Sequence, residues 1–403
     1  MTDEMDEVGG SATAVAMPAG DQRASRQSSQ GPDSATLDSL EKIAVDEDGP
    51  SVVEGDPFNP HKVLNYFDRL AGIVAGELVW PVTVEIDPCN RCNHRCAWCV
   101  STLSHTGEQL EFERFQVLVE ELARLGVRSV VLKGGGEPGI HPAIHRMLHA
   151  AAEAGLAIGL ITNGSMAQPG TLQAVLDTCE WVRISLDAAR PETHRLIHGT
   201  ADFGRILENV EYLAAHARRT LVGLSFVAEA RNHREVGPFC SLARSLDVDY
   251  VSIRCVFDPF SPLPAVIRRE MRRQAEAARR LEDERFRVLL GDFTDRYLNA
   301  DPNEPFPFRR CLGPNLVGII GADGEVYACC FLRGNKGFSF GNLGEESFER
   351  IWSGPRRQAV MARIHAGQCG HVCVGGTTSN RYNTYNEILN YLALGRKRHE
   401  EFI

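Results

Sequence analysis

Three cysteines on one short loop constrain this chain more than any other feature. Cys92, Cys96 and Cys99 form a C-x3-C-x2-C group directly after residues 82–86, an apolar run that predicts a buried strand. Three thiolates on one loop can hold three corners of a cubane iron-sulfur cluster. The fourth iron then lacks a protein ligand, and an open metal position is where a small molecule can coordinate and react. The group therefore predicts a reactive cluster.

A zinc ribbon is the alternative, because Cys89 with Cys92 and Cys96 with Cys99 would supply two C-x2-C pairs. Zinc-binding pairs usually lie roughly 12 to 20 residues apart. Only three residues separate these two pairs. The spacing favours the cluster, and Cys89 is interpreted as a spare thiol or as an outer neighbour of the site.

Strand-like and helix-like segments alternate after this loop. The predicted helices are 112–125, 144–154, 172–178, 203–217 and 236–246, and the predicted strands are 129–132, 157–161, 181–186, 221–227 and 250–255. With the first strand this makes six, which implies a parallel sheet with right-handed crossovers. The predicted fold class is α/β, a partial (β/α)6 TIM-like barrel. Its site should lie at the C-terminal strand ends, where Cys92, Gly134, Asn163 and Asp187 all fall.

Composition divides the rest of the chain. Residues 1–55 are rich in Ser, Gly, Asp, Glu and Ala, so they are predicted to be a disordered tail. The barrel is predicted over 56–260, beginning with a lead-in helix in which apolar residues recur at helical spacing from Val63 to Val74. A helical connector is predicted over 261–305, with a long charged helix at 266–290. A small C-terminal domain is predicted over 306–403.

Charge and composition exclude several classes of protein. The net charge of −10 argues against a nucleic-acid partner, because neutralising phosphates needs a basic surface. No stretch approaches the ~20 apolar residues of a membrane span. The acidic start lacks the regions of a signal peptide, so the protein is predicted to be cytoplasmic. In that compartment, twelve cysteines are better explained by metal binding than by disulfides.

A glycine-rich turn one strand after the cysteine loop strengthens the cluster interpretation. The turn reads Lys133-Gly134-Gly135-Gly136-Glu137, and glycines allow a backbone to approach a ligand closely. Alone, such a turn can be a simple strand-to-helix connection. With the cysteine loop, and with Trp98 just before its last cysteine, it resembles the radical S-adenosylmethionine (SAM) enzymes. In that family the open iron of a [4Fe-4S] cluster binds SAM and cleaves it to a 5′-deoxyadenosyl radical.

The resemblance implies roles for residues at three strand ends. The glycine turn and Glu137 would hold the methionine amino group of SAM. Asn163, Ser185 and Asp187 resemble positions that line the SAM carboxylate and ribose, although each can also belong to an ordinary polar turn.

A second group of cysteines follows residue 306. Asp323-Gly324 between two short apolar runs is a strong hairpin signal, and such a hairpin brings Cys311 and Cys329 together at its open end. Cys330 is the alternative to Cys329, because neighbouring strand residues face opposite sides. With Cys369 and Cys373, this region resembles the twitch form of the SPASM domain, which holds one auxiliary [4Fe-4S] cluster. A four-thiolate zinc site is the alternative. Cys179, Cys240 and Cys255 are interpreted as core thiols.

One catalytic and one auxiliary cluster is a layout that resembles 2-deoxy-scyllo-inosamine dehydrogenase and related carbohydrate-modifying radical SAM enzymes. It implies a small-molecule substrate, an aminocyclitol or sugar of natural-product or antibiotic biosynthesis, oxidised at a secondary alcohol. It also implies a flavodoxin- or ferredoxin-type electron donor. Epimerisation and dehydration are alternatives, and Cys255 or Cys330 would then donate a hydrogen atom.

Two other classes stay open. A peptide-modifying radical SAM enzyme normally has an N-terminal peptide-recognition domain, for which residues 1–55 are too polar. A non-catalytic metal scaffold is the other class, and the glycine turn argues against it. Candidates for a catalytic base or hydroxyl-binding residue lie on or just after predicted strands: Arg183, Arg254, Lys133, His198 and Asp258.

Overall fold

The computed structural model describes residues 57–99, 101, 106–166, 168, 170–256, 263–290, 308–369 and 381–394, all of them in the compact unit Gly55–Ile403. The predictions for residues 1–55, Asp258 and Cys373 fall outside these ranges. Among the described helices, none has both the length and the apolar character that crossing a membrane would need.

The predicted lead-in helix is present as two consecutive segments. The 3-10 helix η1 (Pro60–Tyr66) begins at Asn59, whose side chain accepts a hydrogen bond from the backbone N–H of His61. It continues into α2 (Phe67–Ala75), which ends at Gly76 in the left-handed conformation with φ of 79°.

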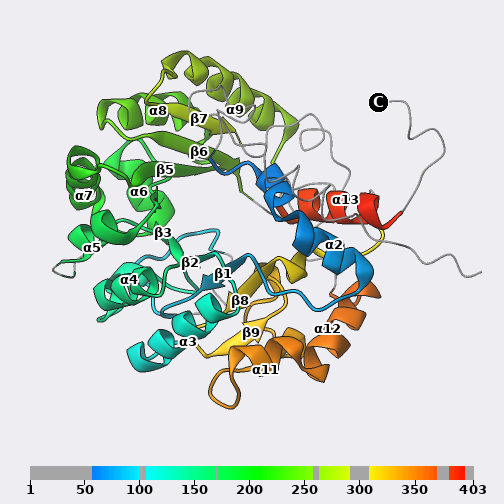
Figure 1. Cartoon of the computed structure of the whole chain (residues 1–403). Coiled ribbons are helices and arrows are strands. Elements are labelled where there is room, and N and C mark those ends of the chain that lie inside the picture. The colour runs from blue at the N-terminus through cyan, green and yellow to red at the C-terminus, as the bar shows by residue number, and fades with distance from the viewer. Residues whose placement is uncertain are drawn as a thin grey trace, which may run out of the picture. The chain divides into compact units, whose positions relative to one another are not determined.

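Strands and helices then alternate as the sequence predicts (Figure 1). The strands are β1 (Thr83–Ile86), β2 (Ser129–Leu132), β3 (Ala157–Thr162), β4 (Trp181–Ser185), β5 (Leu221–Ala228), β6 (Tyr250–Cys255) and β7 (Arg287–Leu290). The helices among them are α3 (Phe112–Arg124), α4 (Ile144–Glu153), α5 (Thr171–Thr178), α6 (Pro191–His198), α7 (Phe203–His216), α8 (Val236–Ser245) and α9 (Ala265–Ala278), with the 3-10 turns η3 (Pro138–Ile140), η4 (His233–Glu235) and η5 (Arg279–Leu281).

The sheet is parallel from β1 to β7, and each strand pairs with the next one along the chain. The α/β fold class with a partial barrel is therefore confirmed. Two details differ from the prediction. The helix expected over 266–290 ends at Ala278, and Arg287–Leu290 form a seventh strand, because Val288 packs into the core beside β6. Helix α6 was not predicted.

Alternation along the strands separates two faces of the sheet. Val84, Ile86, Val182 and Ile184 point to the main core, which the outer helices cover (Figure 1). The residues between them point to the inner face of the sheet, and several are polar: Glu85, Arg183 and Ser185. The inner face is where a barrel of this kind binds its ligands.

The C-terminal region continues this sheet. Strand β8 (Val317–Ile320) pairs in parallel with β1, and β9 (Glu325–Tyr327) and β10 (Ser339–Asn342) follow in antiparallel order. The predicted hairpin between β8 and β9 is confirmed, with Gly324 at φ of 78°. Residues 306–403 are predicted to form a small C-terminal domain, and its strands join the sheet of the barrel through the pairing of β8 with β1. The remaining elements are η6 (Gly313–Asn315), η7 (Cys330–Leu332), η8 (Lys336–Phe338), α11 (Phe348–Ser353), α12 (Pro355–His365) and α13 (Arg381–Ala393).

A second, smaller core lies on the inner face of β8. Val317 and Ile319 of this strand pack with Leu70 of α2 and with Leu389 of α13. Elements from both ends of the described chain therefore cover the same part of the sheet.

Candidate active site

The predicted cluster loop leaves β1 at its C-terminal end, as expected. Cys92, Cys96 and Cys99 are half-buried free thiols. Burial, with smaller contributions from Glu137 and Cys99, raises the pKa of Cys92 to about 11. The pKa of Cys96 is also raised, first by burial and then by nearby negative groups including the other two thiols. Three thiols on one short loop can bind metal once it replaces their protons, so this donor set fits an iron-sulfur cluster.

The glycine turn contacts this loop through backbone atoms. The N–H of Gly136 donates to the carbonyl of Cys89 over 2.9 Å, and the N–H of Glu137 donates to the carbonyl of Arg91 over 2.8 Å. A Cβ atom on Gly136 would lie 1.8 Å from the carbonyl oxygen of Arg91. Only glycine permits this approach.

Cys89 lies behind the loop. Its side chain is fully buried and its thiol donates to the carbonyl of Glu137 over 3.2 Å. Burial raises its pKa to about 12. This contact accounts for Cys89 without a metal, in line with its interpretation as a spare thiol.

The carboxylate of Glu137 is buried and occupied by its own fold. Oε1 accepts from the N–H of Gly139 at 2.7 Å and from the hydroxyl of Thr162 at 2.5 Å, while Oε2 accepts from the N–H of Asn163 at 2.7 Å. Burial raises the pKa of this carboxyl, and the three hydrogen bonds oppose that shift. In this structure Glu137 joins the ends of β2 and β3. Direct contact with the SAM amino group stays a prediction.

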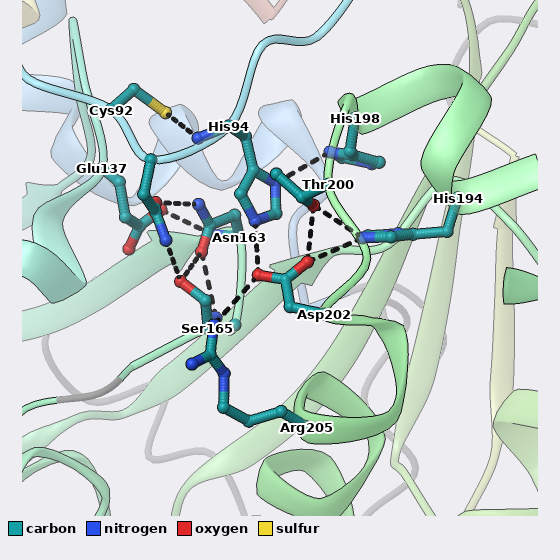
Figure 2. A network of polar contacts seen from close by, with 12 residues as sticks. Cys92, His94, Glu137, Asn163, Ser165, His194, His198, Thr200, Asp202 and Arg205 are labelled. Atoms are coloured by element: carbon teal, nitrogen blue, oxygen red, sulfur yellow. Dashed lines mark hydrogen bonds and ion pairs between the residues drawn. The ribbon is translucent and has the colours of Figure 1, made fainter.

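Asn163 and Asn93 connect the end of β3 to the cluster loop. Asn93 was not predicted from the sequence. The Asn163 amide donates to Oδ1 of Asn93 over 2.8 Å, and Asn93 donates to the hydroxyl of Ser165 over 2.7 Å. The Ser165 hydroxyl in turn donates to Oδ1 of Asn163 over 2.7 Å (Figure 2).

Helix α6 supports the other side of the loop. The N–H groups of Arg95 and Ala97 donate to the last carbonyls of this helix, those of His198 and Ile197, over 2.9 and 3.2 Å. His198 was predicted as a candidate base. The structure places its Nδ1 3.2 Å from the sulfur of Cys96.

Two more histidines, which the sequence did not single out, surround His198 (Figure 2). His94, His194 and His198 are each at most 2 % exposed. Burial lowers the pKa of His94 to about 4. Asp202 lies between His94 and His194, and hydrogen bonds from Thr200 and His94 outweigh its burial and lower its pKa.

Ser185 and Asp187 lie at the end of β4, as predicted. The carboxylate of Asp187 accepts from the N–H of Val227 over 2.6 Å and lies 3.1 Å from Nε2 of His198. Ser185 accepts from the hydroxyl of Ser225 over 3.4 Å. Trp98 is half-buried on the cluster loop. Roles for these residues in SAM binding stay predictions.

The predicted catalytic side chains have different surroundings. The guanidinium of Arg183 is buried 4.3 Å from the ring centre of Phe58, and its Nε donates to the hydroxyl of Tyr250. These contacts give Arg183 a role in packing. Lys133 pairs with Glu85 at 2.5 Å on the inner face. Arg254 is exposed on β6. Their catalytic roles stay predictions.

A second ion pair joins the two cysteine regions. Asp87 follows β1 and Arg333 follows η7, and Nε of Arg333 lies 2.6 Å from Oδ2 of Asp87. Asp87 is fully buried, and its burial outweighs the attraction of Arg333 and raises its pKa to about 6.

Two of the predicted auxiliary ligands, Cys311 and Cys369, lie near each other. Cys311, Cys329 and Cys369 pack against the main core, whereas Cys330 packs against the smaller one. Burial raises the pKa of Cys311 to about 11, and the nearby Cys369 adds to this rise. The Cys330 side chain is also hydrogen-bonded to that of Cys329, so the choice of Cys329 over Cys330 as a ligand stays a prediction.

Comparisons with known proteins agree with this arrangement. Residues 86–235 match the model of the radical SAM superfamily, and residues 311–374 match that of an iron-sulfur cluster-binding domain, SPASM. The chain carries a radical SAM domain followed by a SPASM domain. The cofactor prediction of SAM, a SAM-binding [4Fe-4S] cluster and an auxiliary cluster is thereby confirmed.

Similar proteins include two curated enzymes. Mycofactocin maturase MftC of Mycobacterium ulcerans is 25% identical over 320 residues, 76% of this chain and 84% of the relative. PqqA peptide cyclase of Ruegeria pomeroyi is 26% identical over 279 residues, 68% of this chain and 74% of the relative. Among solved structures, Streptococcus suis SuiB bound to precursor peptide SuiA has a TM-score of 0.60 at 13% identity, covering 81% of this chain and 77% of SuiB. That likeness shows the shared fold.

Proposed function

We propose that this radical SAM enzyme oxidises a peptide. The observation that carries the proposal is its similarity to a maturase and a peptide cyclase, over 76% and 68% of this chain. The aminocyclitol or sugar substrate implied by the sequence finds no such support among these relatives. Peptide modification was the alternative, and it becomes the preferred hypothesis.

Charged residues on the inner face provide places for a polar substrate. Glu85 with Lys133 and Asp87 with Arg333 lie where β1, β2 and the segment after β9 meet. Lys133 is 21% exposed, so it is the accessible member of the first pair. These charged side chains neighbour the glycine turn and both cysteine regions in the sequence. Lys133 directly precedes the glycine turn, Asp87 precedes the cluster loop, and Arg333 follows Cys329 and Cys330.

Cys92, Cys96 and Cys99 would hold the catalytic cluster, and Cys311, Cys329, Cys369 and Cys373 the auxiliary one. When bound, the first cluster with SAM supplies a radical that takes a hydrogen atom from substrate carbon, and the second supplies an acceptor for one further electron. The remaining proton has to pass to a protein group. Lys133 and Glu85 are our candidates, because a base must lie within hydrogen-bond reach of that proton.

Deuterium transfer tests the substrate class. The reconstituted full chain is incubated anaerobically with SAM, a reductant and either peptides encoded beside its gene or a panel of aminocyclitols and sugars. We expect only a peptide to raise 5′-deoxyadenosine above the substrate-free rate, to lose two hydrogen atoms, and to pass deuterium from a labelled carbon into 5′-deoxyadenosine. The Cys96→Ala variant should form none.

A sugar or aminocyclitol that passes its deuterium while no peptide does so would overturn the proposal. That result would restore the oxidation of a secondary alcohol as the preferred reaction.

A further inference from the structure

A buried histidine contacts one of the proposed cluster ligands. The Nδ1 atom of His198 lies 3.2 Å from the sulfur of Cys96 and 3.2 Å from Nδ1 of His94. His198 is the last residue of α6, whose carbonyls also hold the loop backbone. Both the sulfur and the loop that carries it are therefore fixed by the same helix end.

The hydrogen-bond partners of His94 show which nitrogen of His198 carries a proton. Nε2 of His94 lies 3.0 Å from Oδ2 of Asp202, and an ionised carboxylate can only accept, so Nε2 carries the proton of His94 (Figure 2). A buried neutral imidazole has one proton, so Nδ1 of His94 is an acceptor. The facing Nδ1 of His198 must then be the donor.

The same N–H reaches the sulfur of Cys96. A cysteine bound to iron is a thiolate and can only accept, so this contact also requires a proton on Nδ1 of His198. Two independent neighbours thus demand the same tautomer. Oδ2 of Asp187 lies 3.1 Å from the opposite nitrogen, Nε2, but makes no hydrogen bond with it, so this contact does not require a proton on Nε2.

We propose that His198 is a positioning residue of the SAM-binding cluster, whose Nδ1–H donates a hydrogen bond to the sulfur of Cys96 and raises the reduction potential of the cluster. Hydrogen bonds to cluster sulfurs stabilise the more electron-rich reduced state, and outer partners of metal ligands tune the metal in this way. The inference rests on Cys96 being a ligand, as proposed above.

His194 provides a matched control. Its ring stacks on that of His198 with centres 4.5 Å apart, and it is equally buried. Its nitrogens contact the carbonyl of Leu186 and the carboxylate of Asp202, and the described contacts show none to a cysteine. Replacing it disturbs the same packing but leaves the bond to sulfur in place.

Redox titration of the reconstituted full chain tests the inference. The paramagnetic signal that changes on adding SAM is followed in the wild type, His198→Leu, His198→Asn, His198→Gln and His194→Leu. We expect a more negative midpoint potential in His198→Leu and no shift in His194→Leu. The midpoint potential of His198→Asn should lie between those of the wild type and His198→Leu, because its amide N–H can occupy the place of Nδ1–H. The potential of His198→Gln should stay as negative as that of His198→Leu.

Equal potentials in the wild type and His198→Leu at full iron content would overturn the inference, as would an equal shift in His194→Leu. If His198→Leu binds no cluster, His198→Asn is compared with His198→Gln instead. Equal midpoint potentials in these two variants would overturn the inference. Full iron content in Cys96→Ala would instead show that the ligand assignment is wrong.

Discussion

At the scale of single residues, the tightest constraint is the approach of Gly136 to the cluster loop. An added Cβ would lie 1.8 Å from the carbonyl oxygen and 2.4 Å from the carbonyl carbon of Arg91, and neither atom belongs to a flexible side chain. We expect Gly136→Ala to displace the loop and to lower iron bound after reconstitution, with little loss of helical circular dichroism. Gly204→Ala is the control, since nothing lies within 4 Å of its added Cβ on helix α7. If Gly136→Ala and Gly204→Ala bind equal amounts of iron, the cluster loop tolerates the added Cβ atom.

Sequence spacing identified the residues whose chemistry is local. The three cysteines and the glycine turn are contiguous motifs, so they could be recognised without a fold. His94, His194 and Asp202 could not, because each alone resembles an ordinary surface or core residue and His94 is 108 positions from Asp202. Asp87 was also missed, since its partner Arg333 is supplied only by the fold.

At the scale of elements, the ion pair between Asp87 and Arg333 fixes the segment after β9 to the end of β1. Removing one partner of a buried pair typically costs about 3–5 kcal/mol. We therefore expect Arg333→Met to lower the free energy of unfolding by that order. Without Arg333 the pKa of Asp87, already raised to about 6, should rise further. The loss of unfolding free energy caused by Arg333→Met should then be larger at pH 8 than at pH 5. At pH 8 the unpaired Asp87 must either ionise while buried or hold a proton, and both cost free energy.

Denaturant unfolding at the two pH values measures this effect. Arg350→Met is the matched control, because the side chain of Arg350 is 76% exposed and 3.5 Å from Glu346. Such a pair is worth about 0.2–1 kcal/mol. A double variant with Asp87→Asn should lose less than the sum of the single changes. Strict additivity would mean that the two side chains do not interact.

Element boundaries show the limit of periodicity. The helices and strands of the β/α repeat were predicted closely because their apolar faces are long. Strand β7 was missed because four residues carry little periodic signal after a charged helix. Pairing of β8 with β1 was also missed, since it joins segments more than two hundred residues apart.

At the scale of the whole molecule, the two cysteine regions follow strands of one sheet and are predicted to hold separate clusters. We expect about eight irons per wild-type chain, four for each cubane. The triple change of Cys92, Cys96 and Cys99 to Ala should leave about four, because the predicted auxiliary ligands lie on other segments of the chain. Cys240→Ala, a buried core thiol on α8, should keep all of them. Four irons in the wild type and none in the triple variant would leave the SPASM region without a cluster. That outcome would remove the acceptor of the second electron and favour redox-neutral chemistry over oxidation.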